Sequence, residues 1–154
     1  MKLTVIALSA IILSAGTCLA QDGAKRFFTI TAVEPKGAAG IAQEPFPAGP
    51  LPEGGGYVIK QPDQTGRWEV SAYVWAPNQI VVNVGDDVTL QFVGINGASH
   101  PTEIKGLGKA FTVMRGQVTT VNFRPDRPGV YPIVCNTHHP SMTGEVVVLP
   151  RSAQ

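Results

Sequence analysis

Short segments of alternating apolar and polar residues make up most of this chain beyond its first 20 residues. They span residues 26–32, 68–75, 79–84, 88–93, 117–123, 129–134 and 145–149. A period of two places successive side chains on opposite faces of a β-strand. Turn residues such as Gly85-Asp86 separate the segments, and none of them has a helical period. The pattern predicts an all-β protein built as a Greek-key antiparallel β-sandwich.

Residues 34–56 depart from this pattern. They are rich in Gly, Pro and Ala, and include the run Gly54-Gly-Gly56. This composition predicts a long surface loop or flexible arm instead of a regular element. We therefore expect an N-terminal strand and arm over residues 21–66 and a core over residues 67–154.

The first 20 residues have the features of a secretory signal peptide. A charged start at Lys2 precedes an apolar run over residues 3–13 and a small-residue end before Gln21. The run is too short to span a membrane, so we expect cleavage and release into the periplasm or another exported location. A lipid anchor on Cys18 is the less favoured alternative, because Ala15 stands where lipoproteins usually carry Leu.

Charge and cysteine content narrow the function. The chain has 12 basic and 11 acidic residues. It has no basic run, so we expect neither a nucleic-acid partner nor attachment to anionic lipid. Removal of residues 1–20 leaves Cys135 as the one cysteine, which excludes a disulfide scaffold. An unpaired thiol in an exported protein favours a metal ligand.

Residues 135–142 concentrate the ligand chemistry. Cys135, His138, His139 and Met142 lie within eight residues. The third histidine, His100, lies 35 positions before Cys135 and follows the 88–93 segment across a Gly-containing turn. A thiolate, imidazoles and a weak thioether favour copper. Zinc is the rival metal, but it would more naturally use a second cysteine or a carboxylate than a methionine. We expect one copper ion.

At these residues the chain resembles the cupredoxins, the small blue-copper electron carriers. The resemblance covers roughly residues 68–149 and includes the apolar segment 128–134 before a Cys-x-x-His…Met loop. The spacing from His100 to Cys135 is similar to that in the copper domain of cytochrome oxidase subunit II, nitrous oxide reductase and nitrosocyanin. The binuclear centre of the first two needs two bridging thiolates. The one remaining cysteine therefore implies a mononuclear site.

The resemblance implies His100, Cys135, His138 and Met142 as the ligands. His139 is an alternative to His138, because the residues from His139 to Gly144 look like the His-Pro-x-Met-x-Gly ending of amicyanin-like loops. Pro101 is a departure from the family. In cupredoxins the residue after the first histidine often donates its backbone N–H to the cysteine sulfur, and proline has none.

The expected function is single-electron transfer between redox partners such as a cytochrome or a terminal oxidase or reductase, without enzymatic turnover. We expect no membrane span. Three histidines in total are too few for the additional coppers of a multicopper oxidase. Two alternatives remain: a periplasmic copper-binding or delivery protein, and a nitrosocyanin-like red-copper site bound by both His138 and His139.

Overall fold

The computed structural model describes residues 23–151. The expected signal peptide at residues 1–20 lies outside the described residues. Between residues 23 and 151 the chain forms strands and turns and no helix, which confirms the predicted all-β class. Within this range there is accordingly no helix long and apolar enough to cross a membrane.

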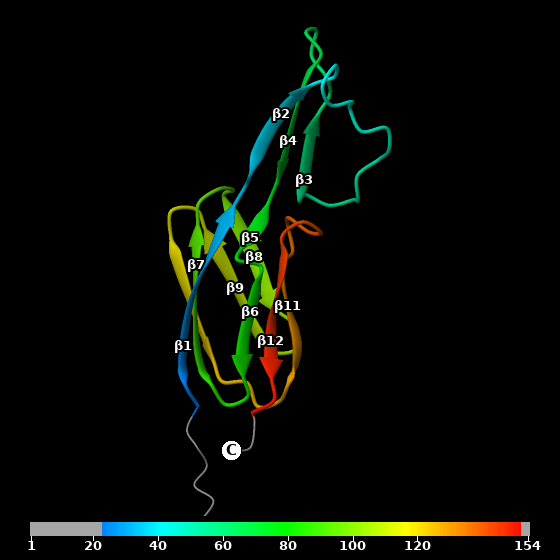
Figure 1. The fold of residues 1–154 in the computed structure, drawn as a ribbon. Coiled ribbons are helices and arrows are strands. Elements are labelled where there is room, and N and C mark those ends of the chain that lie inside the picture. Colours follow the sequence, from blue (N-terminus) through cyan, green and yellow to red (C-terminus); the bar gives the residue numbers. More distant parts are fainter. Residues whose placement is uncertain (1–22, 152–154) are drawn as a thin grey trace, which may run out of the picture.

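The first sheet of the sandwich has the strand order β10-β7-β1-β5. Its strands are β1 (Lys25–Val33), β5 (Val74–Ala76), β7 (Asp87–Gly94) and β10 (Val118–Phe123). β5 and β10 pair antiparallel with their neighbours, whereas β1 runs parallel to β7 along its length. In Figure 1 the strands β1 and β7 form one side of the lower body of the molecule.

The second sheet has the order β6-β12-β11-β8-β9. Its strands are β6 (Gln79–Asn83), β8 (Ser99–Ile104), β9 (Lys109–Met114), β11 (Gly129–Cys135) and β12 (Thr143–Leu149). β6 runs parallel to β12. The sandwich is therefore not wholly antiparallel as expected. Only strands joined by a tight turn must be antiparallel, and neither parallel pair is consecutive in the chain.

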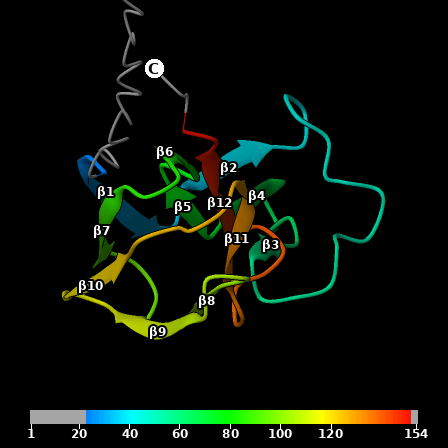
Figure 2. The ribbon, with the colours of Figure 1, turned by 90° about the horizontal axis from the view of Figure 1, so that it is seen from below.

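The core lies between the two sheets (Figure 2). β7 illustrates the alternation, because Val88, Leu90 and Phe92 are buried while the residues between them are more exposed. Burying each such side chain contributes roughly 1.5–3 kcal/mol. The hydrophobic pattern in the sequence therefore corresponds to the packed faces of the sandwich.

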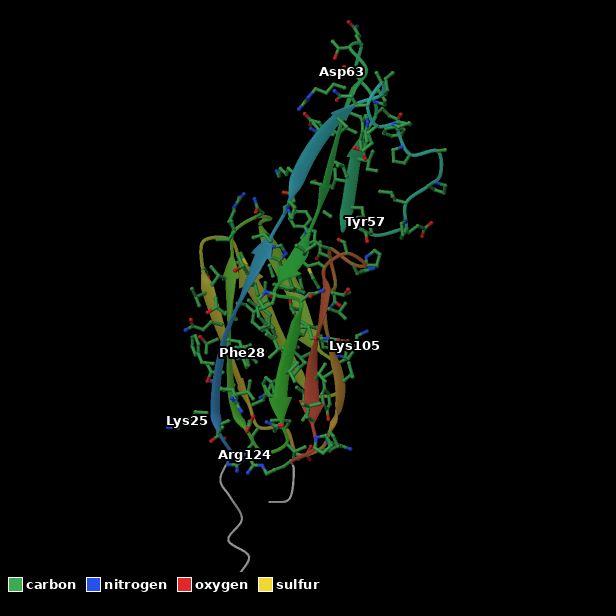
Figure 3. The ribbon with its side chains drawn as sticks, viewed as in Figure 1. Lys25, Phe28, Tyr57, Asp63, Lys105 and Arg124 are labelled. Carbon is green, nitrogen blue, oxygen red and sulfur yellow. The ribbon has the colours of Figure 1, made fainter. Side chains whose placement is uncertain are left out.

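A third sheet extends from one end of the sandwich (Figure 1). It has the order β2-β4-β3, from β2 (Lys36–Gly40), β3 (Tyr57–Lys60) and β4 (Arg67–Ala72). We call this sheet and its connecting loops, residues 34–72, the arm. Figure 3 places Asp63 at the far tip of the arm and Tyr57 near the sandwich.

The structure of the arm differs in one respect from the expectation drawn from the sequence. Residues 36–40 form a regular strand and not the loop that the composition of residues 34–56 predicted. β2 has the sequence Lys-Gly-Ala-Ala-Gly and therefore shows no alternation, but it pairs with β4 over its full length. The hydrogen-bonded partner, and not the side chains, holds this strand extended. Residues 41–56 lie outside the strands.

The expected single strand over residues 68–75 is divided. β4 belongs to the arm and β5 to the sandwich, and Tyr73 lies between them. The chain also passes directly from β1 in the sandwich to β2 in the arm (Figure 1). These two crossings attach the arm to the sandwich.

A buried carboxylate stabilises the end of the sandwich opposite the arm. Asp86 is 1% exposed and accepts hydrogen bonds from the backbone N–H groups of Ala24 (3.1 Å) and Asn83 (3.0 Å). It also pairs with Arg26 at 3.1 Å and Arg151 at 3.5 Å. Burial by itself raises the pKa of Asp86, but the hydrogen bonds from Asn83, Arg26 and Ala24 outweigh it and hold the pKa below its usual value.

Candidate metal centre

Three side chains of types that can bind a metal converge at the arm end of the sandwich. His100 lies on β8, Cys135 ends β11 and His138 lies in the loop that follows. The Sγ atom of Cys135 lies 3.4 Å from Nδ1 of His138 and 3.9 Å from Nδ1 of His100. The two Nδ1 atoms are 3.1 Å apart. The structure thus brings together three of the predicted site residues.

His100 is held more rigidly than the sequence suggested. We expected it to follow the 88–93 strand across a turn, and it lies within a further strand, β8, where it is fully buried beside Thr102 and Ile104. β8 was missed because its buried face carries His and Thr, so the hydrophobic alternation is hidden. The hydroxyl of Thr102 donates to the carbonyl oxygen of His100 at 2.8 Å.

The ring of His100 has a defined orientation. Its Nε2 lies 2.7 Å from the carbonyl oxygen of Asn96. A carbonyl oxygen can only accept, so Nε2 carries the proton of this hydrogen bond. In the neutral ring the lone pair is then on Nδ1, which points toward Cys135. A hydrogen bond of this kind fixes the tautomer that a metal needs.

Backbone hydrogen bonds close the loop that carries the other donors, residues 135–142. The N–H of Cys135 donates to the carbonyl oxygen of Met142 at 3.1 Å, and the N–H of Met142 donates to that of His138 at 3.0 Å. The N–H of Asn136 donates to the carbonyl oxygen of Pro101 on β8 at 2.8 Å. Met142 is fully buried in the same core cluster as Cys135.

The two neighbouring histidines have different environments. His138 is half-buried and directs Nδ1 toward Cys135 and His100, whereas His139 is exposed. The carbonyl oxygen of His139 accepts a hydrogen bond from the N–H of Gly56 in the arm, at 3.3 Å. The cluster of His100, Cys135 and His138 therefore does not include His139.

Burial shifts the pKa values of Cys135 and His138, the two candidate ligands at the start of this loop. It raises the pKa of the Cys135 thiol, although the N–H groups of His138 and Thr137 donate to the sulfur and oppose the shift. Burial, and then the neighbouring His100, lower the pKa of His138. The metal-free site thus favours a neutral thiol and a neutral imidazole. Metal binding would release the thiol proton, because the thiolate is the ligand form.

The donor set fits a single copper ion. Donors bound at about 2.0–2.3 Å from a shared centre lie between about 3 and 4 Å from one another. The three separations of 3.1, 3.4 and 3.9 Å fall in this range. A thiolate with two imidazoles is the trigonal set of blue-copper sites, in which a methionine is the weak axial ligand.

Aromatic rings surround the two imidazoles, and sequence reasoning did not connect them with the site. The ring of Tyr73 lies over that of His138, with centroids 4.0 Å apart and planes at 32°. Trp75 approaches His100 edge-on, with centroids 6.0 Å apart. Tyr73 and Trp75 both lie in the segment 68–75, which we expected to form one continuous strand. Nothing in the sequence marked the break at Tyr73 that directs this ring toward the loop.

The chain is similar to known copper-protein families and structures. The cupredoxin-like domain family matches residues 55–148. Two cytochrome c oxidase subunit 2 proteins of Thermus thermophilus are each 32% identical to this chain over 95 residues. The match covers 55% of this chain, 70% of the first relative and 56% of the second.

A solved structure of a multicopper oxidase, mgLAC, is similar in fold. The alignment has 16% identity and a TM-score of 0.51, and it covers 84% of this chain and 40% of that chain. At this level of identity the likeness concerns the fold alone.

Proposed function

Since this chain belongs to the cupredoxin family, which binds copper, we propose that it is an exported type 1 copper protein that passes single electrons between redox partners. The proposed ligands are His100, Cys135, His138 and Met142. The observation that carries this proposal is the convergence of one sulfur and two Nδ1 atoms within 3.9 Å of one another.

The number of cysteines supports a mononuclear centre. Cys135 is the one cysteine in residues 23–151, and it is not in a disulfide. A binuclear centre would need two bridging thiolates. The relatives are subunits of an oxidase, but we propose that this chain is a carrier and turns over no substrate of its own.

When bound, copper would supply a one-electron couple between Cu(I) and Cu(II). The residues of the chain hold the donors in place for both states. His100 is fixed within a strand and by Asn96, while Cys135 is fixed at the end of β11. Burial of His100, Cys135 and Met142 excludes water from the inner side of the site. A site that changes little between two oxidation states favours fast electron exchange.

We propose that electrons enter and leave near His138. It is half-buried, whereas His100 and Cys135 are fully buried. Redox partners typically bind over small surfaces, and the near-neutral chain has no strong charge excess. A cytochrome, a terminal oxidase or a reductase is the proposed partner, and the similarity to oxidase subunits supports this class.

The test is a spectroelectrochemical titration of the copper-loaded protein, with Cys135→Ser as the control. We expect an intense thiolate-to-copper band that disappears on reduction and returns on oxidation, with one electron per chain. The band should be absent in the control. Copper uptake without colour or without a reversible couple would contradict the proposal and would instead favour copper delivery.

A further inference from the structure

The ring of Tyr73, the residue that directly follows the arm, packs against the imidazole of His138. His138 lies in a loop, and one face of its imidazole is covered by the ring of Tyr73 at a centroid distance of 4.0 Å. Tyr73 is the residue at which the chain crosses from β4 to β5. The position of this ring therefore depends on both the arm and the sandwich.

Hydrogen bonds fix the backbone of Tyr73 to residues 135–142, which we call the ligand loop. Its N–H donates to the carbonyl oxygen of Gly56 at 2.9 Å, and its own carbonyl oxygen accepts from the hydroxyl of Ser141 at 2.8 Å. The N–H of Gly56 in turn donates to the carbonyl oxygen of His139. Tyr73 is thus bound on one side to the arm and on the other to the loop that contains His138.

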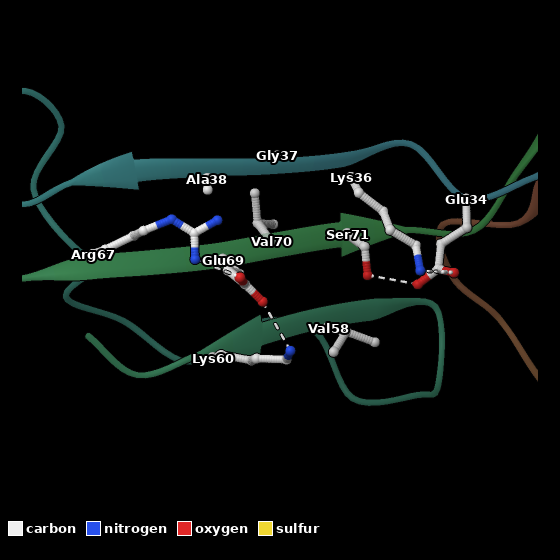
Figure 4. A pocket seen from close by; sticks show the side chains of 10 residues that line it. All are labelled: Glu34, Lys36, Gly37, Ala38, Val58, Lys60, Arg67, Glu69, Val70 and Ser71. Atoms are coloured by element: carbon white, nitrogen blue, oxygen red, sulfur yellow. Dashed lines mark hydrogen bonds and ion pairs between the residues drawn. The ribbon is translucent and has the colours of Figure 1, made fainter. Parts of the chain in front are cut away.

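The side chain of Tyr73 is also held. Its hydroxyl forms a hydrogen bond with Glu34 at the base of the arm. In Figure 4 the Glu34 carboxylate contacts both Ser71, which donates at 2.7 Å, and Lys36, which pairs with it at 3.1 Å. These partners leave Glu34 in one orientation, so the hydroxyl of Tyr73 has a fixed acceptor.

Glu34 connects the same network to the other histidine. Its backbone N–H donates to the side-chain oxygen of Asn96 at 3.1 Å. The backbone oxygen of Asn96 accepts from Nε2 of His100 at 2.7 Å. The base of the arm therefore supports both imidazoles, His100 through Asn96 and His138 through Tyr73.

We propose that Tyr73 is a positioning residue for His138, and that the arm stabilises the metal-binding conformation of this imidazole through it. The proposal rests on the proposed function, because it takes His138 as a copper ligand. Without the stacked ring, a half-buried histidine on a loop would sample other rotamers. Outer contacts that orient a ligand typically change metal affinity by about 10–100-fold.

The test compares Tyr73→Leu, Tyr73→Ala and Tyr73→Phe with the wild-type protein. Leucine keeps apolar volume without the stacking ring, and phenylalanine keeps the ring without the bond to Glu34. Tyr131→Phe is the matched control, because Tyr131 lies on β11 away from the loop and donates its hydroxyl to the carbonyl oxygen of Arg127. Two quantities are measured: the rotamer populations of His138 by NMR in the metal-free protein, and Cu(I) affinity by competition with a chelator.

We expect one His138 rotamer in the wild type, in Tyr73→Phe and in Tyr131→Phe, and averaged rotamers in Tyr73→Leu. Cu(I) affinity should fall at least about tenfold in Tyr73→Leu and Tyr73→Ala. A single His138 rotamer with unchanged affinity in folded Tyr73→Leu would overturn the proposal. The NMR measurement needs no copper. A wild-type protein that fails to bind copper would therefore contradict the proposed function and leave the positioning role to be judged separately.

Discussion

The backbone N–H of Cys135 donates a hydrogen bond to the carbonyl oxygen of Met142, at 3.1 Å, across the base of the ligand loop. This bond joins the end of β11 to the residue before β12. It keeps the thiol and the thioether residue at a fixed separation along the backbone. The number of residues between Cys135 and Met142 therefore helps to set the position of the two side chains.

Replacement of Met142 by Leu should raise the reduction potential by on the order of 60 mV, the one-electron equivalent of a tenfold change in relative affinity. A donor atom stabilises Cu(II) relative to an apolar group, so its removal favours Cu(I). The swap conserves volume and should cost less than about 1.5 kcal/mol of stability. Voltammetry gives the potential, with Met114→Leu, at an exposed methionine, as the control. Equal potentials in the two variants would show that Met142 is not a ligand.

Replacement of Pro101 by Ala should also raise the potential, by about 60 mV. The sulfur of Cys135 accepts from the N–H groups of His138 and Thr137, both on its own loop. Pro101 faces this loop, since its carbonyl oxygen pairs with Asn136 at 2.8 Å. Alanine adds an N–H that can disperse thiolate charge and so favour the reduced state. An unchanged or lower potential would contradict this role.

The close approach of the arm to the ligand loop should make Gly56 sensitive to substitution. A Cβ at this position would lie 2.3 Å from the carbonyl oxygen of His138 and from the hydroxyl of Ser141. We expect Gly56→Ala to lower the free energy of unfolding by roughly 1–3 kcal/mol. Gly40→Ala is the matched control, because nothing lies within 4 Å of its Cβ. Denaturant unfolding measures both, and equal stabilities would refute the close contact.

The Asp86 carboxylate predicts a pH dependence of stability. Its pKa is lowered in the folded protein, so its contribution is present above the unfolded pKa of about 3.9 and is lost as pH falls through the lower folded value. Asp86→Asn should cost about 1–3 kcal/mol at pH 7. The difference between wild type and variant should shrink below about pH 4. Urea unfolding at several pH values checks this, and a constant difference would rule out the assigned charge.

Most strands of the sandwich, but not β8 and β9, could be predicted because their buried faces are apolar. The 88–93 segment became β7 with little change. β8 escaped prediction because His100 and Thr102 occupy its buried face, and β2 because glycine and alanine show no alternation. Sequence patterns indicate which side chains are buried. They do not indicate which strand will pair with a given segment through backbone hydrogen bonds, as β4 does with β2.

The candidate ligands could also be named from the sequence, since few residue types bind copper. The difference between His138 and His139 could not. Adjacent loop residues point in different directions, and the direction depends on the backbone bonds of residues 135–142 and on the arm. The roles of Tyr73 and Asn96 arise from contacts between segments distant in the chain, so spacing gives no signal for them.

We propose that His138, and not its neighbour His139, completes a mononuclear centre with His100 and Cys135. The most direct measurement is the paramagnetic resonance spectrum of copper-loaded His138→Ala and His139→Ala beside the wild type. We predict that His139→Ala keeps the wild-type type 1 spectrum, because its side chain lies outside the cluster, and that His138→Ala loses it. A type 1 spectrum that survives in His138→Ala and disappears in His139→Ala would show that His139 is the ligand.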